Sequence, residues 1–246
     1  MGTIRKIIFV IALIVLLISG YKLGSYFWNA HKEESEFEKL QMKGGHDLVA
    51  LHKANPDCYG WIQVKGTRIN YPVMWTPREP EFYIRRNFKK QPTIAGVPFM
   101  DANSKLGVTK NYMIYGHHIK AGTMFGDLEK FEDKDFWKKH KTFTFDEYRK
   151  GKQITGKYKI MAAFHTKIYP EKSKAFKYYN YAGITTNSDY DKYVKGIKSI
   201  SEYDTGILPK NREQLVTLST CAYHTEDGRF VIVGTKIFSL HPTHIF

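Results

Sequence analysis

The strongest constraint on this chain is a pair of strand-like runs near its C-terminal end. Residues 215–220 and 230–237 are rich in β-branched and apolar side chains, and the polar stretch between them contains the turn signal Asp227-Gly228. Two neighbouring strands joined in this way place Cys221 and Arg229 at the same end of one sheet. A thiol beside a permanent positive charge is an arrangement that suits a nucleophile.

Short β-rich segments recur through most of the chain, and the 17 Tyr and 16 Phe favour β structure over a helical bundle. Helical spacing of apolar residues instead predicts helices over 123–130, 134–140 and 190–201. A closed or nearly closed barrel is the economical way to pair so many short strands, so we expect a mainly β fold with peripheral helices. The remaining predicted strands cover residues 61–64, 69–73, 96–101, 112–115, 142–148 and 158–166.

The N-terminal segment is apolar over residues 7–19, and two interpretations of it compete. A cleaved signal peptide would need a small-x-small site, but bulky residues follow the run. An uncleaved membrane anchor within residues 1–28 fits better, with Tyr26, Phe27 and Trp28 at the membrane interface. Arg5 and Lys6 then place the N-terminal side in the cytoplasm and the following domain outside the cell.

The charged residues 29–47 predict a helical stalk that breaks at Gly44-Gly45, and residues 48–246 form the expected extracellular domain, opening with a short amphipathic helix that ends at Ala54. The net charge of +14 is spread along the chain. It indicates a solvated lysine-rich surface or attraction to anionic lipid headgroups or wall polymers. Signatures of nucleic-acid binding are missing from the sequence, so we expect no nucleic-acid partner.

Only two cysteines occur, Cys58 and Cys221. An extracellular domain without a disulfide framework keeps its thiols for another reason. Cys58 lies where an apolar residue would also fit, so we interpret it as a small buried hydrophobe, with a Cys58–Cys221 disulfide as the alternative. Ligand spacings typical of metal sites are missing, and we expect no metal and no cofactor.

A cysteine nucleophile needs an adjacent base, and the chain has ten histidines. His117 and His118 follow a predicted strand and Gly116, which lets the backbone turn so that an imidazole can lean over a neighbouring strand. His224 is a local rival because it lies three residues after Cys221. Spacing alone leaves these three histidines open.

Taken together, these features resemble the sortases. The signature Thr-Leu-x-Thr-Cys is complete at residues 217–221, Arg229 follows eight residues later, and Tyr115-Gly116-His117 lies upstream. The segments 55–62, 69–73, 115–118 and 124–128, together with helices before the barrel and at 190–201, resemble class B of the family. The resemblance runs from about residue 48 to residue 237. Cys58 and Ala222 depart from the pattern, and Ala222 leaves details of the substrate pocket open.

The resemblance implies an eight-stranded sortase-type barrel and a cysteine transpeptidase of the Gram-positive cell surface. Cys221 would attack the Thr carbonyl of a C-terminal sorting motif in secreted proteins and form a thioester. His117 would act as general acid and then as general base, and Arg229 would steady the substrate and the oxyanion. The acceptor would be a cell-wall precursor or cross-bridge amine, and the N-terminal anchor would sit in the lipid bilayer.

Weaker expectations concern the substrate groove. Ser219, Thr220 and Tyr115 lie within two residues of the catalytic pair, and Ile84 could wall the groove. The segment 168–188, which precedes the predicted helix 190–201, could line the groove as well. Two other functions use the same sequence: a thiol hydrolase with the same residues, or a non-catalytic wall-binding module.

Overall fold

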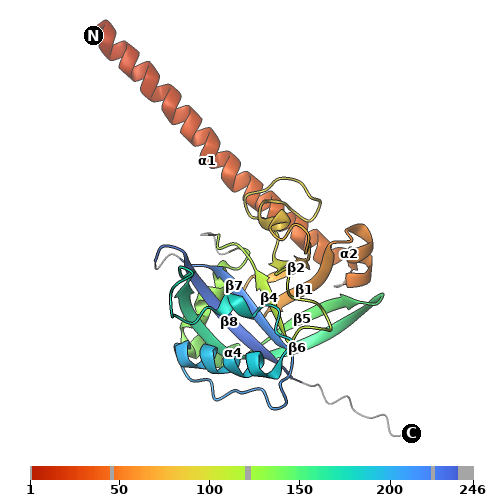
Figure 1. Ribbon diagram of the computed structural model, residues 1–246. Helices are drawn as coiled ribbons and strands as arrows, with labels where there is room; N and C mark the ends of the chain where they lie inside the picture. The colour runs from red at the N-terminus through yellow and green to blue at the C-terminus, as the bar shows by residue number, and fades with distance from the viewer. Residues whose placement is uncertain (1, 45–46, 120–122, 223–224, 238–246) are drawn as a thin grey trace. The chain divides into compact units, whose positions relative to one another are not determined.

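The computed structural model describes residues 2–44, 47–119, 123–222 and 225–237 (Figure 1). The chain divides into two compact units, Met1–Gly45 and His46–Phe246. The first unit contains one helix, α1 (Thr3–Gly44), which runs unbroken through the residues expected as anchor and stalk. Its part Thr3–Ser25 has a mean hydropathy of 2.4 and is long and apolar enough to cross a membrane. Such a helix fits a membrane-anchored or a secreted protein.

The second unit is built on eight strands that close into a barrel in the order β1-β2-β3-β4-β7-β8-β6-β5. Two neighbouring pairs, β2 with β3 and β4 with β7, are parallel, and the others are antiparallel. The predicted closed eight-stranded barrel is therefore confirmed. The strands are β1 (Cys58–Val64), β2 (Asn70–Met74), β3 (Phe99–Met100), β4 (Asn111–Tyr115), β5 (Thr142–Arg149), β6 (Lys152–Lys167), β7 (Leu215–Cys221) and β8 (Gly228–Ile237).

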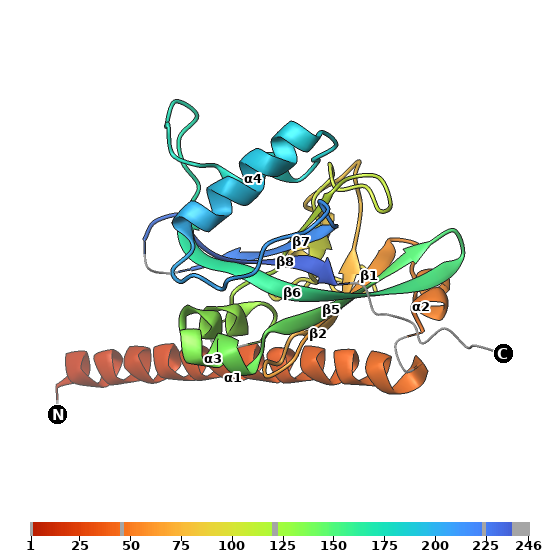
Figure 2. The same ribbon diagram turned by 90° about the horizontal axis from the view of Figure 1, so that it is seen from below.

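Helices surround this barrel, and α4 is the one that matters most for the site. Its apolar residues Tyr190, Tyr193 and Ile197 recur at helical spacing and are buried, and Thr186 caps its first turn. It lies over β6, β7 and β8 (Figure 2), and its buried side chains share one core cluster with η3 and with residues of β4, β6, β7 and β8. The helices of this unit are α2 (Leu48–Ala54), α3 (Lys134–Lys139) and α4 (Asn187–Ile200), with 3₁₀ turns η1 (Phe82–Arg85), η2 (Gly126–Glu132) and η3 (Tyr178–Tyr181).

Strand β7 is buried on both faces because one face lines the barrel and the other lies under α4 and η3. Its polar side chains therefore need partners inside the protein. The hydroxyl of Thr217 lies 2.6 Å from that of Tyr193 and donates to the side chain of Asn111 at 2.9 Å. These bonds join β4, β7 and α4, so they fix the strands that end at the candidate site.

Two predicted strands differ from the structure in length. β6 begins at Lys152 instead of residue 158, since β5 and β6 extend together as a hairpin ribbon whose tip is mostly exposed and polar. β3 covers only Phe99–Met100 of the segment 96–101, and the carbonyl of Pro98 accepts from Met74 just before it. A proline lacks the N–H that a longer strand would need at that position.

Candidate active site

Cys221 and Arg229 form a directly opposed pair on two antiparallel strands. Cys221 is the last residue of β7, and its register partner on β8 is Arg229. Opposed residues point to the same face of a sheet with Cβ atoms roughly 5 Å apart, so the two side chains leave the same face of this strand pair. Both residues are half-buried. Arg229 donates from Nη1 to the carbonyl of Gly228 at 2.8 Å, which holds its side chain along the strand end.

His117 reaches the same edge from β4. Tyr115 pairs with Ser219 in the parallel ladder, and the N–H of Gly116 donates to the Ser219 carbonyl at 3.1 Å. His117 therefore follows the end of β4, where the ladder between β4 and β7 ends two residues before Cys221. Neither side chain hydrogen-bonds the other within the described part of the chain. Catalytic hydrogen bonds are often long without substrate and tighten only in the complex.

The imidazole of His117 is held by the backbone of η1. Its Nε2 atom lies 2.6 Å from the carbonyl oxygen of Ile84. A carbonyl only accepts hydrogen bonds, so this contact requires the proton on Nε2. It leaves Nδ1 as the nitrogen that can exchange a proton with a reacting group.

Gly116 is required by packing and not by an unusual backbone angle. It is absent from the positive-φ residues, whereas a Cβ atom placed on it would lie 2.5 Å from the ring of Phe125. The N–H of Phe125 also donates to the His117 carbonyl at 2.9 Å. Gly116 thus lets the Phe125 ring pack directly against the backbone next to His117.

Of the two alternative histidines, His118 and His224, the structure describes only His118. Nε2 of His118 lies 3.2 Å from Oε2 of Glu129 in an ion pair with η2, and only 11% of the His118 side chain is exposed. His118 also forms an isolated β-bridge with Met124. Its ring is thus engaged with η2. His224 lies outside the described residues.

Behind the cysteine, the structure adds a residue that the sequence did not single out. The hydroxyl of Tyr178 on η3 lies 2.7 Å from Oγ of Ser219, and both groups are buried. Burial raises the pKa of Tyr178 to about 12; the hydrogen bond from Ser219 and the charge of Arg229 oppose this rise, and Cys221 adds to it. Tyr178 therefore contacts β7 two residues before Cys221. The only sequence signal was its place in the segment 168–188.

The other predicted groove residues occupy different positions. Tyr115 turns its hydroxyl to Asp101 Oδ2 at 3.1 Å, and burial followed by the Asp101 charge raises its pKa. Thr220 is 2% exposed, and its hydroxyl has no hydrogen-bond partner among the residues placed by the structure. Ile84 reaches the site through its carbonyl contact with His117.

Cys58 stands apart from this chemistry. Both cysteines are free thiols, so the alternative of a disulfide is wrong. Cys58 is fully buried, and burial raises its pKa to about 12. The interpretation as a buried hydrophobe is confirmed.

A group of Glu132, His165 and Glu202, with ligand atoms within 4.8 Å of one another, is the arrangement in the described chain that comes nearest to a metal centre. None of its members is a predicted catalytic residue.

Comparison with known proteins decides the family. The model of the Sortase domain matches residues 62–237, which is most of the chain and includes all three predicted catalytic residues. The chain belongs to the sortase family. Sortase B of Listeria monocytogenes is 29% identical to it over 248 residues, covering 94% of this chain and 96% of the relative.

Solved sortase structures agree with this assignment. The structure of sortase B from Listeria monocytogenes is 32% identical, with a TM-score of 0.63, and covers 76% of this chain and 98% of that one. A Staphylococcus aureus sortase B–substrate complex is 26% identical, with a TM-score of 0.67 and coverage of 90% and 98%. The class B assignment made from the motifs is confirmed, and this sortase is a cysteine transpeptidase.

Proposed function

We propose that this sortase cleaves a C-terminal sorting motif at its Thr–x bond and transfers the acyl group to a cell-wall amine, with Cys221, His117 and Arg229 as catalytic residues. The observation that carries the proposal is the opposed pair of Cys221 and Arg229 beside His117 at the end of β4. This edge offers a nucleophile, a proton carrier and a fixed positive charge within one short segment of sheet.

The chemistry proceeds in two steps through a thioester. The Cys221 thiolate attacks the Thr carbonyl, the C–N bond breaks, and the leaving amine takes a proton from imidazolium at His117. An incoming amine then attacks the thioester while neutral His117 takes the amine proton, and the thiolate leaves. The negative charge that develops on the carbonyl oxygen in both steps is stabilised by Arg229, whose guanidinium cannot lose its proton.

The substrate class follows from the family. A sortase B from Staphylococcus aureus has been solved with a substrate, which supports peptide binding at the equivalent edge of this barrel. Ser219, Thr220, Tyr115 and Ile84 remain the predicted substrate-binding residues. We favour Ile84 for direct contact, since its backbone touches His117 and its side chain is half-buried. The buried Ser219 would act through Tyr178.

The decisive experiment joins a peptide to an amine. The chain is incubated with a panel of sorting-motif peptides, with and without a wall-type amine, and the thioester on Cys221 is trapped and identified by mass spectrometry. The expected result is peptide–amine product that disappears in Cys221→Ala. Ligation by Cys221→Ala would contradict the proposal. Hydrolysis alone, unaffected by added amine, would assign a thiol hydrolase.

The first unit suggests the location. We propose that Thr3–Ser25 anchors the protein in the cell membrane, with Arg5 and Lys6 on the cytoplasmic side and the catalytic domain outside. This arrangement places the catalytic edge where secreted proteins and wall amines meet. Protease added to intact protoplasts should digest the catalytic domain. A domain that stays protected until the membrane is opened would contradict this topology.

A further inference from the structure

A hydrogen-bonded network beneath η1 is left unexplained by the catalytic chemistry. Its centre is Tyr83, which is fully buried. The Tyr83 hydroxyl donates to Oδ2 of Asp57 at 2.8 Å and accepts from Nδ2 of Asn55 at 2.9 Å. Asn55 is 4% exposed and also donates to the carbonyl of Phe88 at 2.7 Å. The network therefore links the segment before β1 to the loop after η1.

The turn η1 depends on such support. It has four residues, and Glu81 before it makes no side-chain capping hydrogen bond. A 3₁₀ turn of this length is not stable alone, because nucleation costs more than its few hydrogen bonds return. Tyr83 fastens it on both sides, through its hydroxyl to Asn55 and Asp57 and through its carbonyl to the N–H of Val97 at 3.2 Å.

Ile84, the residue after Tyr83, joins η1 to the proposed catalytic histidine. Ile84 presents its carbonyl to Nε2 of His117 at 2.6 Å. This single acceptor sets the tautomer of His117 and the plane of its ring, so any shift of η1 moves the proton carrier relative to Cys221. A displacement of about 1 Å in a catalytic group can reduce rate by as much as ~10²-fold.

We propose that Asn55, Asp57 and Tyr83 are positioning residues that hold the Ile84 carbonyl and thereby fix the tautomer and orientation of His117. This inference rests on the proposed role of His117 as proton carrier. It also gives a purpose to the Asn-Pro-Asp segment, which the sequence showed to resemble class B but which supplies no group to the reaction.

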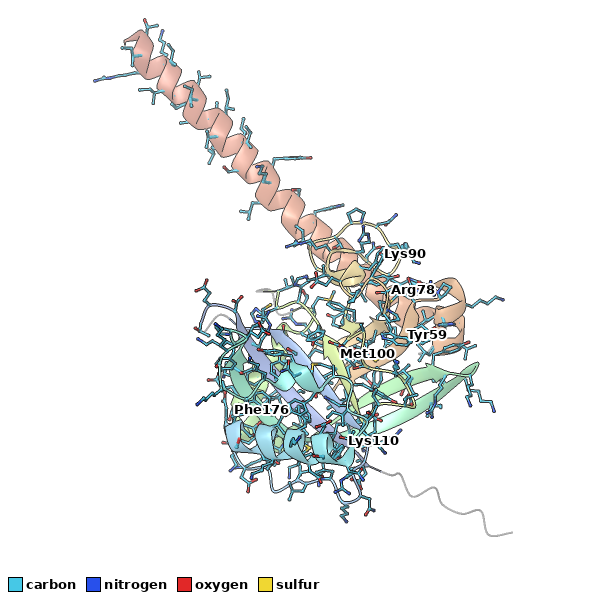
Figure 3. All side chains as sticks on the ribbon, viewed as in Figure 1. Tyr59, Arg78, Lys90, Met100, Lys110 and Phe176 are labelled. Atoms are coloured by element: carbon cyan, nitrogen blue, oxygen red, sulfur yellow. The ribbon has the colours of Figure 1, made fainter. Side chains whose placement is uncertain are left out.

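Asp57 extends the network beyond Tyr83 and Asn55. Asp57 also pairs with Nζ of Lys90 at 2.8 Å, and both line a pocket of about 540 Å³ together with Tyr59, Trp75 and Phe82. Figure 3 shows Tyr59, Arg78 and Lys90 in this region. Tyr59 also lines the pocket, and among the described residues its hydroxyl makes no hydrogen bond to the network, so it offers a matched control.

The test compares Tyr83→Phe with Tyr59→Phe. Each removes one hydroxyl from the same neighbourhood, but only the first breaks the network. In Tyr83→Phe we expect kcat for peptide–amine ligation to fall about tenfold with KM changed less than twofold. In ¹⁵N NMR, the Nε2–H tautomer of His117 should give way to a mixture. Tyr59→Phe should keep wild-type kcat and tautomer. Circular dichroism confirms that each variant is folded at the assay temperature.

A second pair separates hydrogen bonding from folding. Asp57→Asn keeps an acceptor oxygen for Tyr83 and should retain most of the wild-type kcat, whereas Asp57→Leu should lose about tenfold. Wild-type kcat and an unchanged tautomer in Tyr83→Phe would overturn the proposal, as would an equal loss in Tyr59→Phe. If the wild-type protein formed no thioester at all, the proposed function would fail instead.

Discussion

At the scale of the residue, the two cysteines show that surroundings decide reactivity. Cys58 is fully buried and its pKa is raised to about 12 by burial, whereas Cys221 is half-buried beside Arg229. A thiol reacts as the thiolate and only when reagent can reach it. Iodoacetamide at pH 8 should therefore add one label, on Cys221. Mass spectrometry of Cys221→Ala should show no label until the protein is denatured, and early labelling of Cys58 would contradict this.

A second residue-scale prediction concerns Gly96. Its φ is +63°, and a Cβ atom there would lie 2.5 Å from the Ile84 carbonyl oxygen that accepts from His117. Gly96→Ala should destabilise the fold by roughly 1–2 kcal/mol and lower kcat, because both φ and the clash act on η1. Urea unfolding and ligation kinetics measure the two effects. Gly151→Ala, also at positive φ but with open space around it, should lose stability without losing kcat.

The sequence was sufficient for the residues that share one edge of the sheet. Cys221 and Arg229 are eight positions apart on two strands joined by a turn, so strand pairing alone predicts that they lie opposite one another. Tyr178 is different. It reaches Ser219 from 41 positions away, across a loop and α4. No local pattern encodes such a contact, since it depends on how η3 packs on the finished sheet.

At the scale of the element, the N-terminal cap of α4 is expected to stabilise the helix that packs over β7, the strand of Cys221. Thr186 Oγ1 accepts from the N–H of Asp189 at 3.1 Å and donates to its carboxylate at 2.8 Å. Thr186→Ala should cost about 1 kcal/mol, because it leaves a helix N-terminus uncapped. Thermal unfolding should show a lowered Tm in Thr186→Ala and an almost unchanged one in Thr186→Ser. Equal Tm values in both variants would contradict the role of the cap.

Elements with a regular burial pattern were predictable, and those without one were not. β5 alternates half-buried and buried positions over most of its length, and its expected span 142–148 is nearly that of Thr142–Arg149. The start of β6 escaped prediction because Lys152–Lys157 holds a single large apolar residue, Ile154, and half of its positions are exposed, so it shows no alternating apolar pattern. The turn η2 lies partly within the predicted helix 123–130, but it is a 3₁₀ turn over Gly126–Glu132.

At the scale of the whole molecule, the second unit should fold without α1. It contains the entire barrel and its core, and the division of the chain lies at Gly45–His46. A protein that begins at residue 47 should show the same cooperative unfolding transition and the same kcat on soluble peptides. Fractionation of cells should find it away from the membrane. A large fall in Tm would mean that the first unit contributes to folding.

The parallel pairing of β4 with β7 also bears on the order of folding. Asn111 and Thr217, joined by a hydrogen bond, are 106 positions apart, and β5, β6 and α4 all lie between them in the chain. Closing so long a loop is slow, because the entropy must be lost before the contacts form. His117 and Cys221 consequently meet only when β7 docks. Recovered ligation activity during refolding should therefore appear later than recovered secondary structure. Ligation activity is then a measure of the last folding step, the pairing of β7 with β4.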